Sequence, residues 1–231
     1  MRSAPGCPIL AIVDALVTGA TGYIGAALVR RLLERGHAVR ALVREGSRGK
    51  LPPGATPVVG DALDAASVAS ALRPADSLIH LVGTPHPGPA KTALFRSIDL
   101  VSIEASVTAA RDVRVAQLVY VSVAQPAPVM RDYIEVRARG EALIRAAGLT
   151  ATLVRPWYVV GPGHWWPVAL IPLYAIAQWV PGLRDSAQRL GLVTLEQMVA
   201  TLVAAVETPP PAGTQRVVDV PAIRAARVSP G

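Results

Sequence analysis

Apolar positions along the chain follow two different periods. Short apolar runs alternate with longer segments in which apolar residues recur every three to four positions. The short runs predict strands at 15–17, 37–43, 56–60, 77–82, 117–122, 150–155 and 216–220. The longer segments predict helices after residue 22, over 65–72, from about 91 to 111, from 133 to 147 and over 195–207. Strands that alternate with helical crossovers predict an α/β fold, in which helices cover both faces of a doubly wound parallel sheet.

A glycine turn joins the first predicted strand to the first predicted helix. The sequence VTGATGYIG at 17–25 places Gly19, Gly22 and Gly25 at intervals of three residues. The first glycine permits a sharp turn, the second lets a phosphate approach the backbone, and the third lets the helix pack close to the strand. The free N–H groups at the start of the helix then predict a pyrophosphate site. The alternative is a glycine-rich turn without a ligand.

Two segments resemble a known family. TGATGYIG resembles the glycine motif of the extended and atypical short-chain dehydrogenase/reductases, and GLTATLVRPWYVVGPG at 148–163 resembles the NmrA-like and complex-I-accessory-type members of that group. The resemblance covers residues 14–220 and implies a single Rossmann-like domain with a small apolar C-terminal insertion. It implies an NAD(P)(H) site with Asp61 at the adenine and Gly83 and Thr84 beside the nicotinamide ribose. The residues implied to contact the cofactor are Gly19, Thr21, Gly22, Tyr23, Ile24, Gly25, Asp61, Gly83, Thr84, Arg137, Pro156 and Trp157.

The end of the second predicted strand bears on which dinucleotide binds. In a Rossmann half, an acidic residue there holds the 2′-hydroxyl of the adenine ribose, whereas an arginine accommodates a 2′-phosphate. Arg44 follows this strand directly. The sequence therefore favours NADP(H) over NAD(H), the alternative being that Arg44 is an ordinary solvated loop charge.

Three residues correspond to the catalytic set of the family. Ser122 ends the fifth predicted strand, and Tyr133 and Arg137 lie four residues apart on one face of the next helix. The resemblance implies that Ser122 polarises a substrate carbonyl and that Tyr133 is the acid/base. Arg137 stands where the family has lysine. It keeps a positive charge near the phenol, but its planar guanidinium differs in shape from the compact ammonium group of a lysine. The alternative is that Tyr133 and Arg137 are surface residues of an amphipathic helix.

Two classes of function follow from these residues. The first is an NAD(P)(H)-dependent oxidoreductase, or a related epimerase, that acts on an apolar small molecule. The second is a non-catalytic NADP(H)-binding sensor, or an assembly or membrane-associated scaffold protein. The missing lysine favours the second class, while the retained serine and tyrosine favour the first.

The predicted insertion comprises residues 156–193. Its first part, residues 156–183, contains no Asp, Glu, Lys or Arg. Its length approaches that of a membrane span, but Pro167, Pro172 and Pro181 interrupt it. Three interpretations remain: an apolar lid or wall over a substrate pocket, a segment that lies in a membrane surface, or a dimer surface. His164 within it is either an acid/base of that pocket or a packing residue.

The charge and the cysteine content bear on which partners and metals the protein binds. The formal charge of +7 comes largely from arginines scattered along the chain, which does not favour nucleic acid as a partner. The single cysteine, Cys7, permits no intrachain disulfide and no cysteine metal site, and we predict no metal. We expect a cytoplasmic protein, or one peripheral to the inner membrane, with residues 1–13 as a loose extension and 221–231 as a loose tail. The oligomeric state stays open.

Overall fold

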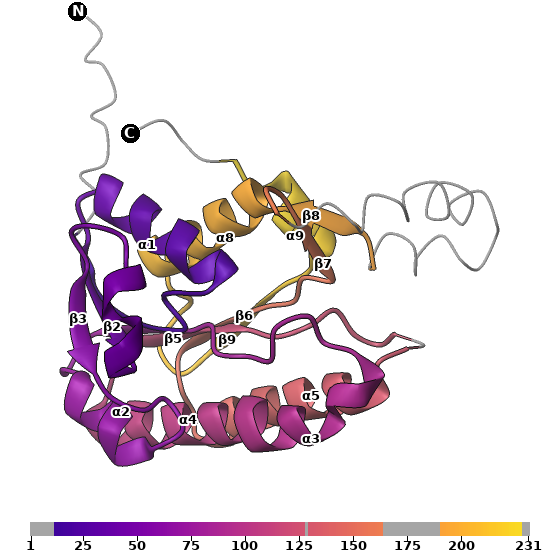
Figure 1. The fold of residues 1–231 in the computed structure, drawn as a ribbon, viewed down its shortest axis with the longest axis horizontal. Helices are drawn as coiled ribbons and strands as arrows, with labels where there is room; N and C mark the ends of the chain where they lie inside the picture. The colour runs from indigo at the N-terminus through magenta and orange to yellow at the C-terminus, as the bar shows by residue number, and fades with distance from the viewer. Residues whose placement is uncertain (1–11, 128, 164–189, 228–231) are drawn as a thin grey trace, which may run out of the picture.

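The structure, a computed structural model, describes residues 12–127, 129–163 and 190–227 (Figure 1). Seven strands form one sheet in the order β3-β2-β1-β4-β5-β6-β9, and every neighbouring pair is parallel. The strands are β1 (Asp14–Thr18), β2 (Ala38–Val43), β3 (Thr56–Val59), β4 (Ser77–His80), β5 (Gln117–Val121), β6 (Ala151–Val154) and β9 (Gln215–Val218). The predicted doubly wound Rossmann-like α/β class is confirmed, and each predicted strand end lies within two residues of the observed one.

Helices form a layer on each face of the sheet (Figure 1). One layer contains α1 (Tyr23–Glu34), α8 (Leu195–Glu207) and α9 (Val220–Ala225), and the other contains α2 (Ala65–Ala71), α4 (Val101–Val113) and α5 (Arg131–Ala146). Each layer closes its own apolar core. Leu28 and Leu202 are fully buried in the first core, and Ile103 and Ile144 are fully buried in the second. Burial on both faces is what the nearly continuous apolar strands require.

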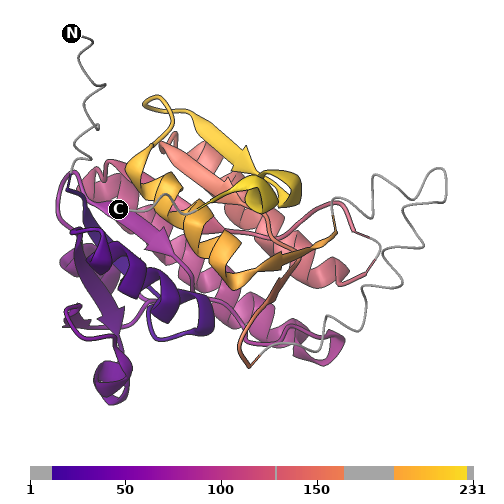
Figure 2. The same cartoon turned by 90° about the horizontal axis from the view of Figure 1, so that it is seen from above.

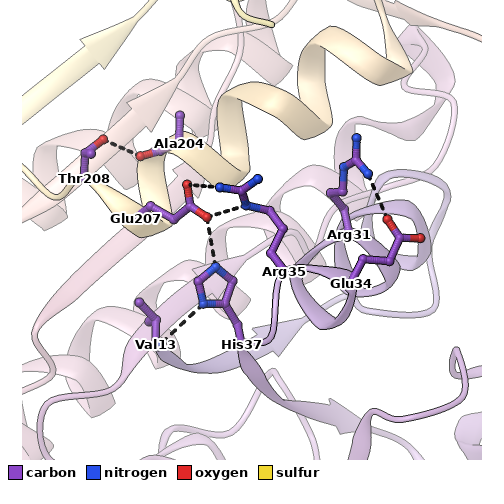
Figure 3. Close-up of polar contacts among 8 residues, drawn as sticks. All are labelled: Val13, Arg31, Glu34, Arg35, His37, Ala204, Glu207 and Thr208. Carbon is purple, nitrogen blue, oxygen red and sulfur yellow. Dashed lines mark hydrogen bonds and ion pairs between the residues drawn. The ribbon is translucent and has the colours of Figure 1, made fainter. Parts of the chain in front are cut away.

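The helices α1 and α8 lie side by side, as the view from above shows (Figure 2). An ionic cluster joins their ends (Figure 3). Glu207 of α8 accepts hydrogen bonds from Arg35 Nε at 2.5 Å and from His37 Nε2 at 3.1 Å. His37 Nδ1 in turn accepts from the backbone N–H of Val13 at 3.3 Å. The cluster therefore links the start of the described chain to residues near its C-terminal end.

The helical segment predicted from about residue 91 to 111 has an interrupted geometry. It comprises the single-turn helices η2 (Pro89–Lys91) and α3 (Thr92–Leu94), the π-helical stretch η3 (Phe95–Leu100), and then α4. Wide turns of this kind occur often at functional sites. Here the π-helical stretch carries the buried residue Asp99.

The loose tail expected from Pro221 is wrong for its first residues. Helix α9 begins at Val220, buries Val220 and Ile223, and is capped by Asp219, whose side chain accepts from the N–H of Ala222. A proline in the first turn favours a helix start, because the N–H that it lacks would be unpaired there anyway. The folded part of the chain therefore continues beyond residue 220.

A second, two-stranded parallel sheet pairs β7 (Tyr158–Val160) with β8 (Leu192–Thr194), and neither strand was predicted. The expectations for residues 1–11, for His164 and for the remainder of the apolar stretch up to 183 lie outside the described residues. Within the described ranges, no helix has the length and apolar character needed to cross a membrane.

Candidate functional site

The three glycines of the turn between β1 and α1 occupy positions where a side chain would not fit or would block access. Gly19 has φ +76°, and a Cβ there would lie 2.8 Å from the carbonyl carbon of Leu81. A Cβ on Gly25 would collide with the carbonyl oxygen of Gly19 and lie 2.9 Å from Ala20 Cα. Gly22 precedes α1, and no side chain caps the helix at this point. The first N–H groups of α1 are therefore left for an anionic group.

Two cavities flank the glycine turn, and Gly19, Gly22, Leu81 and Gly83 line both of them. The first, of about 410 Å³, extends toward the ends of β2 and β3, and we call it the arginine-lined cavity. The second, of about 460 Å³, extends toward Trp157, and we call it the aromatic-lined cavity. Together they form a cleft across the carboxyl ends of β1, β2 and β4, where ligands bind in open α/β sheets.

The arginine-lined cavity brings together Thr21, Arg44 and Asp61, three of the residues predicted to contact the cofactor, and adds Ser47. Arg44 is exposed and forms no ion pair with any residue in the described ranges. Asp61 Oδ1 accepts a hydrogen bond from the N–H of Leu63 at 2.9 Å, which fixes the turn that carries this carboxylate. An unpaired guanidinium at this end suits a phosphate group.

Tyr23, Ile24 and Trp157, which were predicted to contact the cofactor, line the aromatic-lined cavity together with Tyr158 and the loop Pro85–Pro87. The indole of Trp157 meets the ring of Tyr158 edge-on at 5.5 Å between centroids. Burial raises the pKa of Tyr23, so its phenol stays neutral. This end of the cleft is predominantly apolar.

Thr84 and Pro156, both predicted to contact the cofactor, line neither cavity. Thr84 is 5% exposed, and its N–H and its Oγ1 both donate to Asp99 Oδ2, at 3.0 and 2.6 Å. Pro156 is buried, and its carbonyl accepts from the N–H of Ala124. Both residues are therefore buried beside the cleft and do not line it.

Ser122 is 3% exposed and lines neither cavity of the cleft. Its Oγ makes no hydrogen bond within the described ranges, although it is close enough to Glu141 to lower the pKa of that carboxyl. Burial alone would raise the pKa of Glu141, but hydrogen bonds from Arg155 at 2.5 and 2.8 Å outweigh it. The structure therefore places Ser122 behind the cleft.

Tyr133 and Arg137 share one face of α5, as their spacing predicted. The guanidinium carbon of Arg137 lies 5.2 Å from the centre of the Tyr133 ring, and this ring packs on Phe95 at 5.0 Å. Tyr133 lines a third, smaller cavity of about 160 Å³ beside Phe95 and Met130. Polar and charged residues line the same cavity, and Tyr133 lines neither of the two cavities of the cleft.

Arg137 is 5% exposed and is held by two acceptors. Its Nη2 donates to Asp99 Oδ1 at 2.6 Å, and its Nη1 donates to the carbonyl of Val121 at 3.0 Å. The guanidinium lies so close to Gly83 that a Cβ on this glycine would collide with it. Arg137 therefore supports the floor of the cleft at Gly83 rather than lining the cavities.

Sequence reasoning missed Asp99 and His86. Asp99 is fully buried, and it joins Arg137 of α5 to Thr84 of the loop after β4. An acidic residue inside an otherwise apolar helix face was a signal that some basic partner exists, but not which one. His86 lines the aromatic-lined cavity, and its place between Pro85 and Pro87 had suggested only a loop.

The fold and the cleft define a dinucleotide-binding protein of the short-chain dehydrogenase/reductase type. Residues 19–161 match the model of a family described as NAD(P)H-binding, and the chain belongs to that family. The protein therefore takes a nicotinamide dinucleotide as its cofactor. The uncapped helix start and the glycine positions that exclude a Cβ fit the pyrophosphate of such a cofactor.

Curated relatives and solved structures agree with this assignment. The chain is 29% identical over 201 residues to a ceramide reductase of Caulobacter vibrioides, covering 84% of this chain and 61% of that protein. It is 33% identical over 174 residues to a 3-diazoavenalumate denitrifying reductase of a Streptomyces species, covering 64% and 57%. The chain thus spans about three fifths of the length of these relatives.

Two solved structures share the fold. A UDP-galactose 4-epimerase superposes with a TM-score of 0.66 at 20% identity, covering 89% of this chain and 76% of the epimerase. The Bordetella bronchiseptica enzyme WbmH in complex with NAD⁺ superposes with a TM-score of 0.64 at 22% identity, covering 85% and 73%. At these identities the likeness supports the Rossmann-like fold alone.

Proposed function

We propose that the protein is an NADP(H)-dependent oxidoreductase, or a related epimerase, that acts on an apolar small molecule. The observation that carries the proposal is the cleft itself, which places an unpaired arginine at one end of the glycine turn and an apolar, aromatic wall at the other. The names of the relatives support it, because those proteins are reductases of small molecules. When bound, the cofactor would supply or accept a hydride at the aromatic end.

The residues that would hold the cofactor follow from the lining of the cleft. Gly19, Thr21 and Gly22 would bind the pyrophosphate, while Gly83 and Trp157 would lie along the nicotinamide half. Tyr23, Ile24 and Gly25 line the same half. Asp61 would contact the adenine from the turn that its own side chain stabilises.

The preference for NADP(H) rests on Arg44. Its guanidinium is exposed, lines the arginine-lined cavity together with Ser47, and has no acidic partner in the described ranges. A guanidinium bonds a phosphate through two parallel N–H groups, which a ribose hydroxyl cannot exploit.

Titration of the purified protein with NADPH and NADH tests this preference. Arg44→Asp should weaken NADPH binding by at least about tenfold, because it replaces a charge-assisted contact with repulsion, and should change NADH binding little. Arg48→Asp is the matched control, since Arg48 is also exposed but pairs with Glu45 and does not line the cavity. Equal losses for both dinucleotides would contradict the preference, and binding of neither would contradict the cofactor site.

Tyr133 is the proposed acid/base. The guanidinium carbon of Arg137 lies 5.2 Å from the centre of its ring. Arg137 is itself held by the ion pair with Asp99 and lies close to Gly83. We expect Tyr133→Phe to lose turnover while it keeps NADPH affinity.

A second candidate is a non-catalytic NADP(H)-binding sensor or scaffold. The observation in its favour is that Ser122 is buried and that Arg137, at the position of the family's lysine, is engaged in a buried ion pair. Tight NADPH binding without NADPH oxidation on a panel of apolar ketones would favour this candidate.

A further inference from the structure

We infer that Asp99 sets the relative affinity of the cleft for the oxidised and the reduced cofactor, because its carboxylate balances the charge of Arg137 behind Gly83. The inference rests on the proposed function. It starts from a difference between the two forms: the nicotinamide ring of NADP⁺ carries a positive charge, and the ring of NADPH carries none. A fixed charge near this ring therefore changes the affinity for one form more than for the other.

The lining of the aromatic-lined cavity supplies no such charge. No Asp, Glu, Lys or Arg is among the described residues that line it. Lys91 donates to the carbonyls of Pro85 and His86 in the loop beside the cavity, but this contact is solvent-exposed, so water and salt screen its charge. The charges that remain to be considered lie directly behind the lining.

Arg137 lies directly behind Gly83, the glycine that lines both cavities of the cleft. A Cβ on Gly83 would collide with Arg137 Nη2, so no side chain separates this nitrogen from the glycine. Arg137 is buried, and a charge acts more strongly in such surroundings than in water. Arginine does not lose its proton in proteins. Without a counter-ion, this permanent cation would disfavour NADP⁺.

Asp99 is that counter-ion. It is fully buried, and its Oδ1 lies 2.6 Å from Arg137 Nη2, the nitrogen that approaches Gly83. It accepts hydrogen bonds from this nitrogen and from the N–H and Oγ1 of Thr84, which is the pattern of an ionised carboxylate. Asp99 Oδ1 would lie 3.2 Å from a Cβ on Gly83, so both charges stand immediately behind the glycine. Together they give the floor of the cleft little net charge.

The first test compares the dissociation constants of NADP⁺ and NADPH, both measured by calorimetry. Asp99→Asn leaves the charge of Arg137 unbalanced and should raise the ratio of the Kd of NADP⁺ to that of NADPH about tenfold. A merely structural effect would weaken both forms alike. An unchanged ratio in folded Asp99→Asn protein would overturn the inference.

Asp76→Asn is the matched control for this test. Asp76 also neutralises a largely buried arginine, Arg40. It precedes β4, at the amino ends of the strands, whereas the cleft lies across their carboxyl ends. We therefore expect Asp76→Asn to keep the wild-type ratio, and a shift equal to that of Asp99→Asn would contradict a local effect of charge.

The second test reverses the sign and does not depend on how well Asp99→Asn folds. Arg137→Gln removes the cation and leaves Asp99 with its two hydrogen bonds from Thr84, so its carboxylate is ionised at about pH 9. The same ratio should then fall about tenfold. An unchanged or higher ratio, in protein shown to be folded by circular dichroism, would overturn the inference. If the wild-type protein bound neither form, the proposed function would fail instead.

Discussion

At the scale of single residues, the cleft is supported by one buried carboxylate. Asp99 accepts hydrogen bonds from Thr84 through one oxygen and from Arg137 through the other. It thereby ties the loop after β4 to helix α5. The Arg137 guanidinium also lies where a Cβ on Gly83 would collide with it.

Replacing Asp99 by asparagine should be strongly destabilising. The change leaves the charge of Arg137 buried without its counter-ion, which typically costs about 3–5 kcal/mol of the free energy of unfolding. Asp112→Asn is the control, because Asp112 and Arg111 form a pair that is more than half exposed. Removing an exposed pair costs about 0–1 kcal/mol. Urea unfolding measures both values, and similar losses for the two variants would show that Asp99 is not a key ionic contact.

At the scale of elements, the start of α8 shows how a local signal determines a helix boundary. Thr194 Oγ1 accepts from the N–H of Gln197, and the Gln197 side chain accepts from the N–H of Thr194. The spacing of three residues between Thr194 and Gln197 is the sequence signature of this reciprocal cap. The helix begins at Leu195 and ends at Glu207, as the sequence indicated.

Thr194→Ala should destabilise the protein by about 1 kcal/mol, because the backbone N–H of Gln197 at the start of α8 loses its partner. In a chain of this size such a loss lowers the melting temperature by roughly 2–4 °C. Thr194→Ser keeps the hydroxyl and should melt close to the wild type. Calorimetry distinguishes the variants, and a melting temperature for Thr194→Ser as low as that of Thr194→Ala would contradict a role for the cap.

At the scale of the whole molecule, the sheet buries a histidine that cannot easily be charged. Burial lowers the pKa of His80 from its usual 6.5 to about 3, and the charge of Arg137 adds to the effect. Its Nδ1 lies 2.9 Å from Ser106 Oγ and 3.3 Å from Thr18 Oγ1. The folded protein therefore keeps His80 neutral over a pH range in which the unfolded chain would protonate it.

The sign of the resulting pH dependence follows from this difference in bound protons. Since the folded pKa of His80 is depressed, its contribution is complete above about pH 6.5 and is lost as the pH falls toward 3. The slope from this single group is about 1.4 kcal/mol per pH unit. The free energy of unfolding, measured with urea at several pH values between neutral pH and pH 4, should fall less steeply with falling pH for His80→Gln than for the wild type. Parallel slopes would contradict a buried neutral histidine.

The sequence by itself determined where the strands lie along the chain, where the glycine turn and the cap of α8 fall, and that Arg44 follows β2. These features depend on residues close together along the chain, so periodicity and spacing are sufficient to find them. The helix α9 was missed although its signal was local, because Pro221 indicated a stop where it marks a first turn.

Only the tertiary structure decided which side chains reach the cleft. Ser122 and Thr84 follow strands that end at the cleft, yet both are buried behind it. Arg137 pairs with an aspartate 38 residues away, and His86 and Trp157, from loops far apart in the sequence, line the same cavity. Whether a polar side chain faces a ligand or a buried partner depends on contacts between distant segments. Those contacts form only when the helix layers close on the sheet.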